Sequence, residues 1–145
     1  MIKTAAWDYV SRQAFRACGA ALLVAGTFLV GCGGVWWHDR LEPTLQRAAA
    51  TRQLVLVQFR TLADPTCIEA DSILFSDNDV IQAVKDFQCV RLDYVLNREL
   101  ADQYGVTVVP SYVVLRPDGS VIDRRSGRID PDAFRAFLRW ASLKR

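Results

Sequence analysis

The chain has 145 residues, of which 51% are hydrophobic and 23% are charged. This composition fits one globular domain and excludes a disordered, collagen-like or low-complexity protein. The net charge is +2, and it comes from the first 16 residues, because residues 38–145 carry 15 basic and 15 acidic side chains. We therefore expect no nucleic-acid partner.

The N-terminus has the pattern of a membrane segment. Ala17–Trp37 is a run of 21 uncharged residues, and Arg12 and Arg16 precede it. As a helix, this run would rise about 31 Å, which matches the hydrocarbon core of a bilayer. One interpretation is therefore a single transmembrane anchor, with Trp36 and Trp37 at the membrane interface and the basic flank in the cytoplasm.

A bacterial lipobox is the competing interpretation. Leu29-Val30-Gly31-Cys32 resembles that motif and ends a 14-residue apolar run, a normal length for a signal peptide. Cys32 would then be lipidated and would begin a mature chain of 114 residues. We prefer the lipobox, because glycines at positions 31, 33 and 34 would weaken a spanning helix. Both alternatives predict a signal or anchor over residues 1–37. A domain over residues 38–145 would then be tethered in the bacterial cell envelope, facing the periplasm or the exterior.

The rest of the chain alternates predicted strands and helices. The predicted helices are Glu42–Thr51, Cys67–Leu74, Ser76–Phe87, Asn97–Tyr104 and a last segment that starts at Pro131. The predicted strands are Leu54–Phe59, Cys89–Tyr94, Ser111–Arg116 and Ser120–Arg125. Asp77 and Asp130 are expected helix caps, and Pro117-Asp118-Gly119-Ser120 is an expected hairpin turn. This order predicts an α/β domain in which helices cover both faces of a mixed sheet.

Two short segments then indicate a family. Phe75-Ser76-Asp77 opens a predicted helix, and Gly105-Val106-Thr107-Val108-Val109-Pro110-Ser111 leads into the hairpin. At this spacing, both resemble segments of the thioredoxin-like fold, and in particular of the C-terminal domain of bacterial transmembrane disulfide reductases. The resemblance covers about residues 53–143. It implies a thioredoxin-like fold with a cis peptide bond between Val109 and Pro110.

The active-site motif of that family is degenerate in this sequence. Counts from the preceding strand and from the following F-S-D segment both align the family's W-C-x-x-C with Ala63-Asp64-Pro65-Thr66-Cys67. By this resemblance, Asp64 replaces the attacking cysteine and Cys67 keeps the position of the resolving cysteine. Aspartate is a good helix cap but cannot attack a disulfide. The buried acid that the family often carries in the preceding strand is replaced by Gln58.

We therefore expect no dithiol oxidoreductase activity. Cys67 is interpreted as a buried structural residue, and single-thiol exchange through Cys67 is the alternative. Cys89 cannot supply the missing partner, because it begins its strand some 13 Å from the strand's other end, where the site lies. Cys18 lies in the N-terminal segment. The only histidine, His38, flanks that segment. This position excludes a Cys–His dyad and a Ser–His–Asp triad as the catalytic site.

The remaining charged residues are expected to be solvated. Glu69 and Asp71 are two apart on a helix and do not share a face. A basic side of the hairpin is formed by Arg116, Arg124, Arg125 and Arg128. The sequence contains no phosphate-binding loop and no metal-ligand cluster, so we expect no cofactor and no metal.

Together these observations predict a membrane-tethered binding or adaptor module. In the fold that the resemblance implies, the backbone of Val109, next to Pro110, can pair with an extended peptide of a protein partner. The alternative function is a single-thiol thiol–disulfide oxidoreductase that uses Cys67.

Overall fold

The structure of the chain is a computed structural model, and it describes residues 34–145. The expected lipobox with Cys32, and Cys18, lie outside these residues. Within residues 34–145, no helix combines the length and the apolar character needed to cross a membrane.

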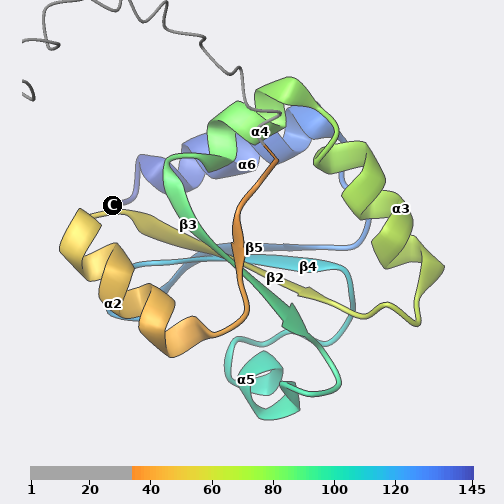
Figure 1. Ribbon diagram of the computed structural model, residues 1–145, viewed down its shortest axis with the longest axis horizontal. Coiled ribbons are helices and arrows are strands. Elements are labelled where there is room, and N and C mark those ends of the chain that lie inside the picture. Colours follow the sequence, from red (N-terminus) through yellow and green to blue (C-terminus); the bar gives the residue numbers. More distant parts are fainter. Residues whose placement is uncertain (1–33) are drawn as a thin grey trace, which may run out of the picture. The chain divides into compact units, whose positions relative to one another are not determined.

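The described part of the chain contains alternating strands and helices. In chain order they are β1 (Trp37–His38), α2 (Leu41–Thr51), β2 (Leu54–Arg60), α3 (Pro65–Leu74), α4 (Asn78–Val84), β3 (Phe87–Asp93), α5 (Arg98–Gln103), β4 (Ser111–Leu115), β5 (Val121–Ser126) and α6 (Pro131–Ser142). The strands form one five-stranded sheet in the order β1-β3-β2-β4-β5 (Figure 1). The first three are parallel to one another, and β4 and β5 are each antiparallel to a neighbour. The predicted mixed sheet is confirmed.

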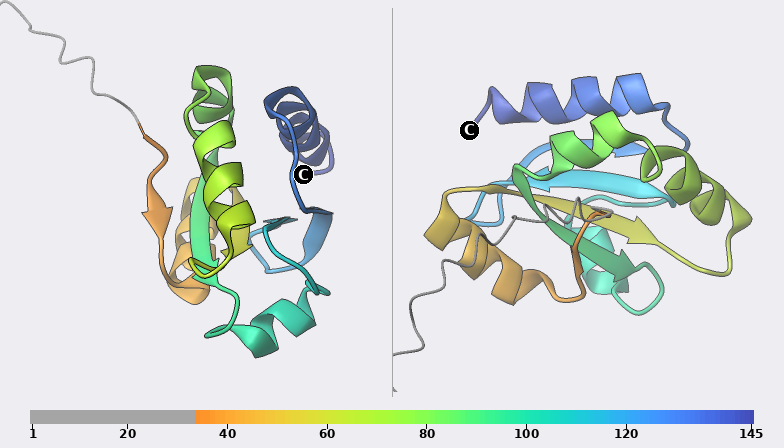
Figure 2. Two further views of the ribbon diagram at one scale, coloured as in Figure 1. Left: turned by 90° about the vertical axis from the view of Figure 1, so that its right-hand side faces the viewer. Right: turned by 45° about the horizontal axis from the view of Figure 1, so that its top comes forward.

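Helices cover both faces of this sheet (Figures 1 and 2). Side chains alternate along a strand, so Leu54 and Leu56 of β2 pack with α3, α4 and α6, while Val55, Val57 and Phe59 pack with α2 and α5. Both faces are apolar because the sheet is central in the domain. Gln58 lies on the face of Leu54 and Leu56, beneath α3, and is fully buried.

Aspartates begin three of the helices. Asp64 caps α3, Asp77 caps α4 and Asp130 caps α6, each by accepting a hydrogen bond from a backbone amide of the first turn. The caps at Asp77 and Asp130 confirm the prediction. The predicted helix Ser76–Phe87 is too long, because Phe87 pairs with Leu54 and already belongs to β3.

The first strand was not predicted. Trp37 pairs with Cys89 across β1 and β3, and its ring packs edge-on against Phe75 with centroids 5.0 Å apart. The side chain of Val35 also packs on the core. Trp37, which the sequence pattern assigned to the N-terminal segment, therefore belongs to the folded domain, because it covers the apolar side chain of Phe75.

Candidate functional site

The degenerate motif lies in the loop after β2 and in the first turn of α3. The Asp64 carboxylate accepts a hydrogen bond from the Thr66 amide at 2.8 Å, and Pro65 occupies the first position of the helix, where a missing N–H costs nothing. Ala63 and Thr66 are exposed at the surface. The position that the family uses for an attacking thiolate is thus a helix cap.

Cys67 lies one turn further on and is 0% exposed. Burial raises the pKa of its thiol, and this effect and the nearby carboxylates of Asp64 and Asp71 outweigh a hydrogen bond with the Thr61 backbone and the charge of Arg60. A nucleophilic cysteine needs a thiolate and access to its target. Cys67 has neither in this structure, and its environment is that of a structural residue.

A polar cluster lies beneath the motif, and we call it the Asp71 cluster: Gln58, Arg60, Asp71 and Arg91. The Asp71 carboxylate accepts hydrogen bonds from the Gln58 amide and the Arg60 guanidinium, and Arg91 lies 3.5 Å from it. Arg91 also donates to the Gln58 amide oxygen at 2.8 Å. The expectation that Asp71 is solvated is wrong, because its side chain is only 15% exposed and is paired with two arginines.

The Asp71 cluster contains a carboxylate close to the position of the acid that is missing from β2. By the resemblance, a buried carboxylate belongs at position 58, where this chain has Gln58. The structure supplies a carboxylate from the opposing helix instead, hydrogen-bonded to that glutamine. Two hydrogen-bond donors and two positive charges hold it as an acceptor. Glu69, in contrast, is exposed as expected, in a surface pair with Arg128.

Val109 and Pro110 lie at the same end of the sheet as the degenerate motif. Phe59, next to the end of β2, pairs with Ser111 at the start of β4, so the loop after β2 and the segment before β4 meet there. The Val109–Pro110 peptide bond is cis, as predicted. The fold thus brings the predicted motif residues and the two predicted peptide-binding residues to one end of the sheet.

The backbone around Pro110 is anchored on both sides of Val109. The Ser111 hydroxyl contacts the Val108 carbonyl at 2.6 Å and the Ser126 hydroxyl at 2.7 Å, and the Gly127 amide donates to the Pro110 carbonyl at 2.7 Å. Val109 itself is different. Among residues 34–145, neither its amide nor its carbonyl has a hydrogen-bond partner. The chain thus holds the amide and the carbonyl of Val109 without partners, between two anchored neighbours.

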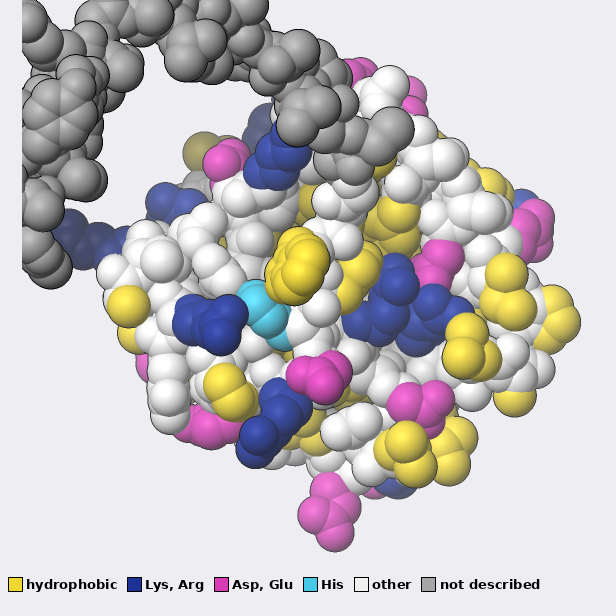
Figure 3. Space-filling view, viewed as in Figure 1, with side chains coloured by type: hydrophobic (Ala, Val, Ile, Leu, Met, Phe, Trp, Pro, Cys, Tyr) yellow, Lys and Arg dark blue, Asp and Glu magenta, His cyan; other side chains and the backbone are white. Residues whose placement is uncertain are grey.

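Apolar side chains are exposed on the loop after β2, on α3 and on the segment before Pro110. Leu62, Ile68 and Val108 are all exposed, and Figure 3 shows hydrophobic side chains at the surface over α3, beside a group of basic side chains. A shallow depression of about 550 Å³ is lined by Leu62, Ile68, Arg60 and Arg91, together with Trp37 and Phe75 on the side of β1. The Arg91 guanidinium lies 4.3 Å from the centre of the Trp37 ring, which fixes its orientation. Sequence patterns did not reveal this surface.

Within residues 34–145, Cys67 and Cys89 are both free and buried, and burial raises the pKa of Cys89 to about 12. Among the same residues, no three His, Cys, Asp or Glu side chains are placed to hold a metal ion.

Comparisons with known proteins point to one family. A family model described as a thioredoxin-like domain matches residues 41–142. The thiol:disulfide interchange protein DsbD of Pseudomonas fluorescens is 34% identical in an alignment of 112 positions, which covers 72% of this chain and 18% of that protein. The chain therefore spans less than a fifth of that relative.

Solved structures share the fold. A thioredoxin from Thermus thermophilus aligns with a TM-score of 0.69 and 24% identity, over 77% of this chain and 89% of that one. The DsbH oxidoreductase aligns with a TM-score of 0.68 and 17% identity, over 93% and 99% of the two chains. The C-terminal domain of Neisseria meningitidis DsbD, in its oxidised form, gives 0.57 and 22%, over 71% and 90%.

Proposed function

Since this chain belongs to the thioredoxin-like domain family, we propose that it binds an extended segment of another protein at the edge beside Val109, without catalysing dithiol exchange. It is related to disulfide oxidoreductases, and its own motif has one cysteine where their chemistry needs two. The binding surface does not depend on that cysteine.

The observation that carries the proposal is that the backbone amide and carbonyl of Val109 lack partners. An amide and a carbonyl that have no partner within residues 34–145 can each form a hydrogen bond with a strand laid alongside them. Val109 is half-buried, so its backbone can be reached by another chain. An incoming strand would supply the missing partners.

Nearby side chains suggest which residues the bound segment of the partner contains. Leu62, Ile68 and Val108 offer apolar contacts. Arg60 and Arg91 share one carboxylate, that of Asp71. These three side chains therefore give the depression a net positive charge. The segment that fits best is extended and apolar, with an acidic residue placed to reach Arg60 or Arg91.

A second function is thiol–disulfide exchange through Cys67 alone. The name of the Pseudomonas relative favours it, since that protein is a thiol:disulfide interchange protein. The full burial of Cys67 and its raised pKa disfavour it. Alkylation separates the two, because a thiol used in exchange reacts in the folded protein, whereas a structural thiol reacts only on unfolding.

We further propose that residues before the domain tether it to a bacterial membrane. The support is the uncharged run that starts at Ala17 after a basic flank, and the lipobox-like Leu29-Val30-Gly31-Cys32 within it. From the same pattern, we propose that the domain faces the periplasm or the exterior.

Selection from a random peptide library tests the binding function. The full chain, immobilised in a nonionic detergent, should enrich extended apolar peptides with an acidic residue. Val108→Asp should weaken their binding at least about tenfold, because it places a charge in the apolar contact. Leu143→Asp is the matched control, an exposed leucine at the far end of α6, and should have no effect. Failure to enrich any peptide, or equal loss in both variants, would contradict the proposal.

A further inference from the structure

Basic side chains gather at one end of the domain, the end at which β2 and β3 begin. These two strands start side by side, with Leu54 paired to Phe87, and β4 ends beside them. Helix α6 ends there too, because Arg116, which follows β4, donates a hydrogen bond to the Lys144 carbonyl at 3.0 Å. We call this region the basic end, and its basic side chains are Arg52, Lys85, Arg116, Arg139 and Lys144.

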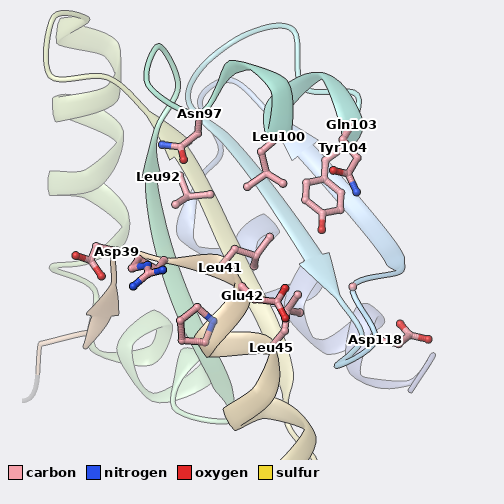
Figure 4. Close-up of a pocket in the computed structure, with 13 residues that line it drawn as sticks. Asp39, Leu41, Glu42, Leu45, Leu92, Asn97, Leu100, Gln103, Tyr104 and Asp118 are labelled. Carbon is pink, nitrogen blue, oxygen red and sulfur yellow. The ribbon is translucent and has the colours of Figure 1, made fainter.

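The basic end carries a positive charge that acidic side chains do not balance. Among residues 34–145, none of its five basic side chains forms an ion pair. The acidic residues beside them are Asp86 and Asp118, and Asp118 lies on the β4–β5 turn (Figure 4), where it accepts hydrogen bonds from Ser120. Asp123, further along β5, is already paired with Arg125. The surface of this end therefore attracts anions, although residues 38–145 as a whole carry equal numbers of basic and acidic side chains.

Exposed apolar side chains lie among these charges. Trp140 in the last turn of α6 is half exposed, and Leu143, directly after the helix, is exposed. The Lys144 ammonium lies 4.4 Å from the centre of the Trp140 ring. Tryptophan and leucine beside lysine and arginine are typical of protein surfaces that lie on lipid headgroups, where the apolar groups enter the interface and the cations meet phosphate.

The chain also enters the described domain at this end. Gly34, the first described residue, and Trp36 line the same depression as Lys85, which precedes β3, and Trp36 is 80% exposed. Cys32 of the lipobox-like motif precedes Gly34 by two residues, which span at most about 7 Å of extended chain. A membrane tether would therefore bring this end of the domain to the bilayer, and not the end with Val109.

We propose that the basic end binds an anionic phospholipid surface. The inference rests on the tether proposed above and adds which face the domain turns to the membrane. Charge selects this occupant, because each lysine or arginine near an anionic bilayer adds to the attraction. Strand β2 separates the two ends of the sheet by about 20 Å, more than the Debye length at physiological salt. The edge at Val109 then faces away from the bilayer and stays open to a peptide.

The test places the full chain, labelled with ¹⁵N, on nanodiscs of phosphatidylcholine alone or with about one third phosphatidylglycerol. Retention on the neutral discs in gel filtration tests the tether by itself, and loss from them would contradict the tether and this inference together. A trace of lipid with a gadolinium chelate on its headgroup then broadens the amide signals that lie near the bilayer. On anionic discs, the Leu143 amide should broaden at least about threefold more than the Val109 amide, because the two lie at opposite ends of the sheet. On neutral discs this broadening ratio should be close to one.

Charge reversal shows whether the basic end is responsible. Lys85→Glu combined with Lys144→Glu should lower the broadening ratio on anionic discs to its value on neutral discs. The matched control is Arg98→Glu combined with Arg128→Glu, which changes the net charge equally at two exposed arginines outside the basic end and should keep the ratio. Equal ratios on the two kinds of disc, with the chain retained on both, would overturn this inference alone and leave an acidic protein surface as the occupant. The same loss in both double variants would also overturn it.

Discussion

The Asp71 carboxylate on α3 accepts a hydrogen bond from the Gln58 amide on β2. This contact joins the helix of the degenerate motif to the strand beneath it, and Arg60 and Arg91 complete it from β2 and β3. A carboxylate therefore remains under the motif although position 58 has lost its acid. Its charge is held by the two arginines, so its role is to fix α3 on the sheet.

Removing this charge should destabilise the domain. In Asp71→Asn, Arg60, whose side chain is 13% exposed, and Arg91 would lose their common partner. Unpaired, largely buried charges are costly, so we expect a loss of about 2–3 kcal/mol in the free energy of unfolding. Urea denaturation measures it. The control is Asp102→Asn, which breaks an exposed pair with Arg98 and should cost less than about 0.5 kcal/mol. Equal costs would show that the Asp71 cluster is not a structural ion pair.

The motif itself predicts a second result. The wild type should not accelerate the reduction of insulin by dithiothreitol, because Asp64 caps a helix and cannot attack sulfur. Asp64→Cys should let the introduced thiol form a disulfide with Cys67 on mild oxidation, which peptide mapping by mass spectrometry detects. Leu62→Cys is the control, since position 62 lies outside the motif spacing. Catalysis by the wild type would contradict the assignment.

Stability should fall at alkaline pH. Burial raises the pKa of Cys89 from 9.0 to about 12 in the folded chain, so the unfolded chain loses this proton first as the pH rises. The stabilisation is complete below pH 9 and is lost as the pH rises from about 9 toward about 12, at up to about 1.4 kcal/mol per pH unit. Burial also raises the pKa of Tyr112, whose hydroxyl has no partner within residues 34–145.

Urea denaturation at several pH values between 8 and 10.5 tests this dependence. Cys89→Ala should be less stable than the wild type at pH 8, because it leaves a small cavity. Its stability should fall less steeply above pH 9, because one titrating group is gone. Parallel pH profiles for the two proteins would mean that Cys89 does not titrate as a buried thiol.

The N-terminal proposal predicts a processed, acylated protein. If the lipobox interpretation is correct, the mature chain begins at Cys32, and its acyl chains contribute about 0.8 kcal/mol of membrane binding for each buried CH₂. Cys32→Ala should then leave the full-length precursor. A transmembrane anchor predicts instead that this variant changes neither size nor membrane association. Intact mass decides, because an unprocessed chain without lipid has a mass near 16.3 kDa.

The elements that the sequence predicted well carry local signals. Asp77 and Asp130 stand directly before their helices, and the turn at Asp118 and Gly119 joins two antiparallel strands. The cis bond before Pro110 followed from a family segment. Each of these features is determined by a few neighbouring residues or by a motif.

The features that were missed depend on residues far apart in the chain. Asp71 looked solvated because its partners, Gln58 and Arg91, lie on two strands. Trp37 was hidden in the uncharged run before it, and only Phe75 and Cys89 show that it belongs to the sheet. The unpaired amide and carbonyl of Val109 are visible only once all the neighbours of this residue are placed.

The backbone amide of Val109 provides the most direct test of the proposed binding function. Its hydrogen exchange should be measured by NMR in the full chain, with and without a peptide selected from the library. If the peptide adds a strand at this edge, the Val109 amide gains a hydrogen bond and its exchange should slow at least about tenfold, while the amide of Leu143 keeps its rate. A bound peptide that leaves the exchange of Val109 unchanged would contradict the account.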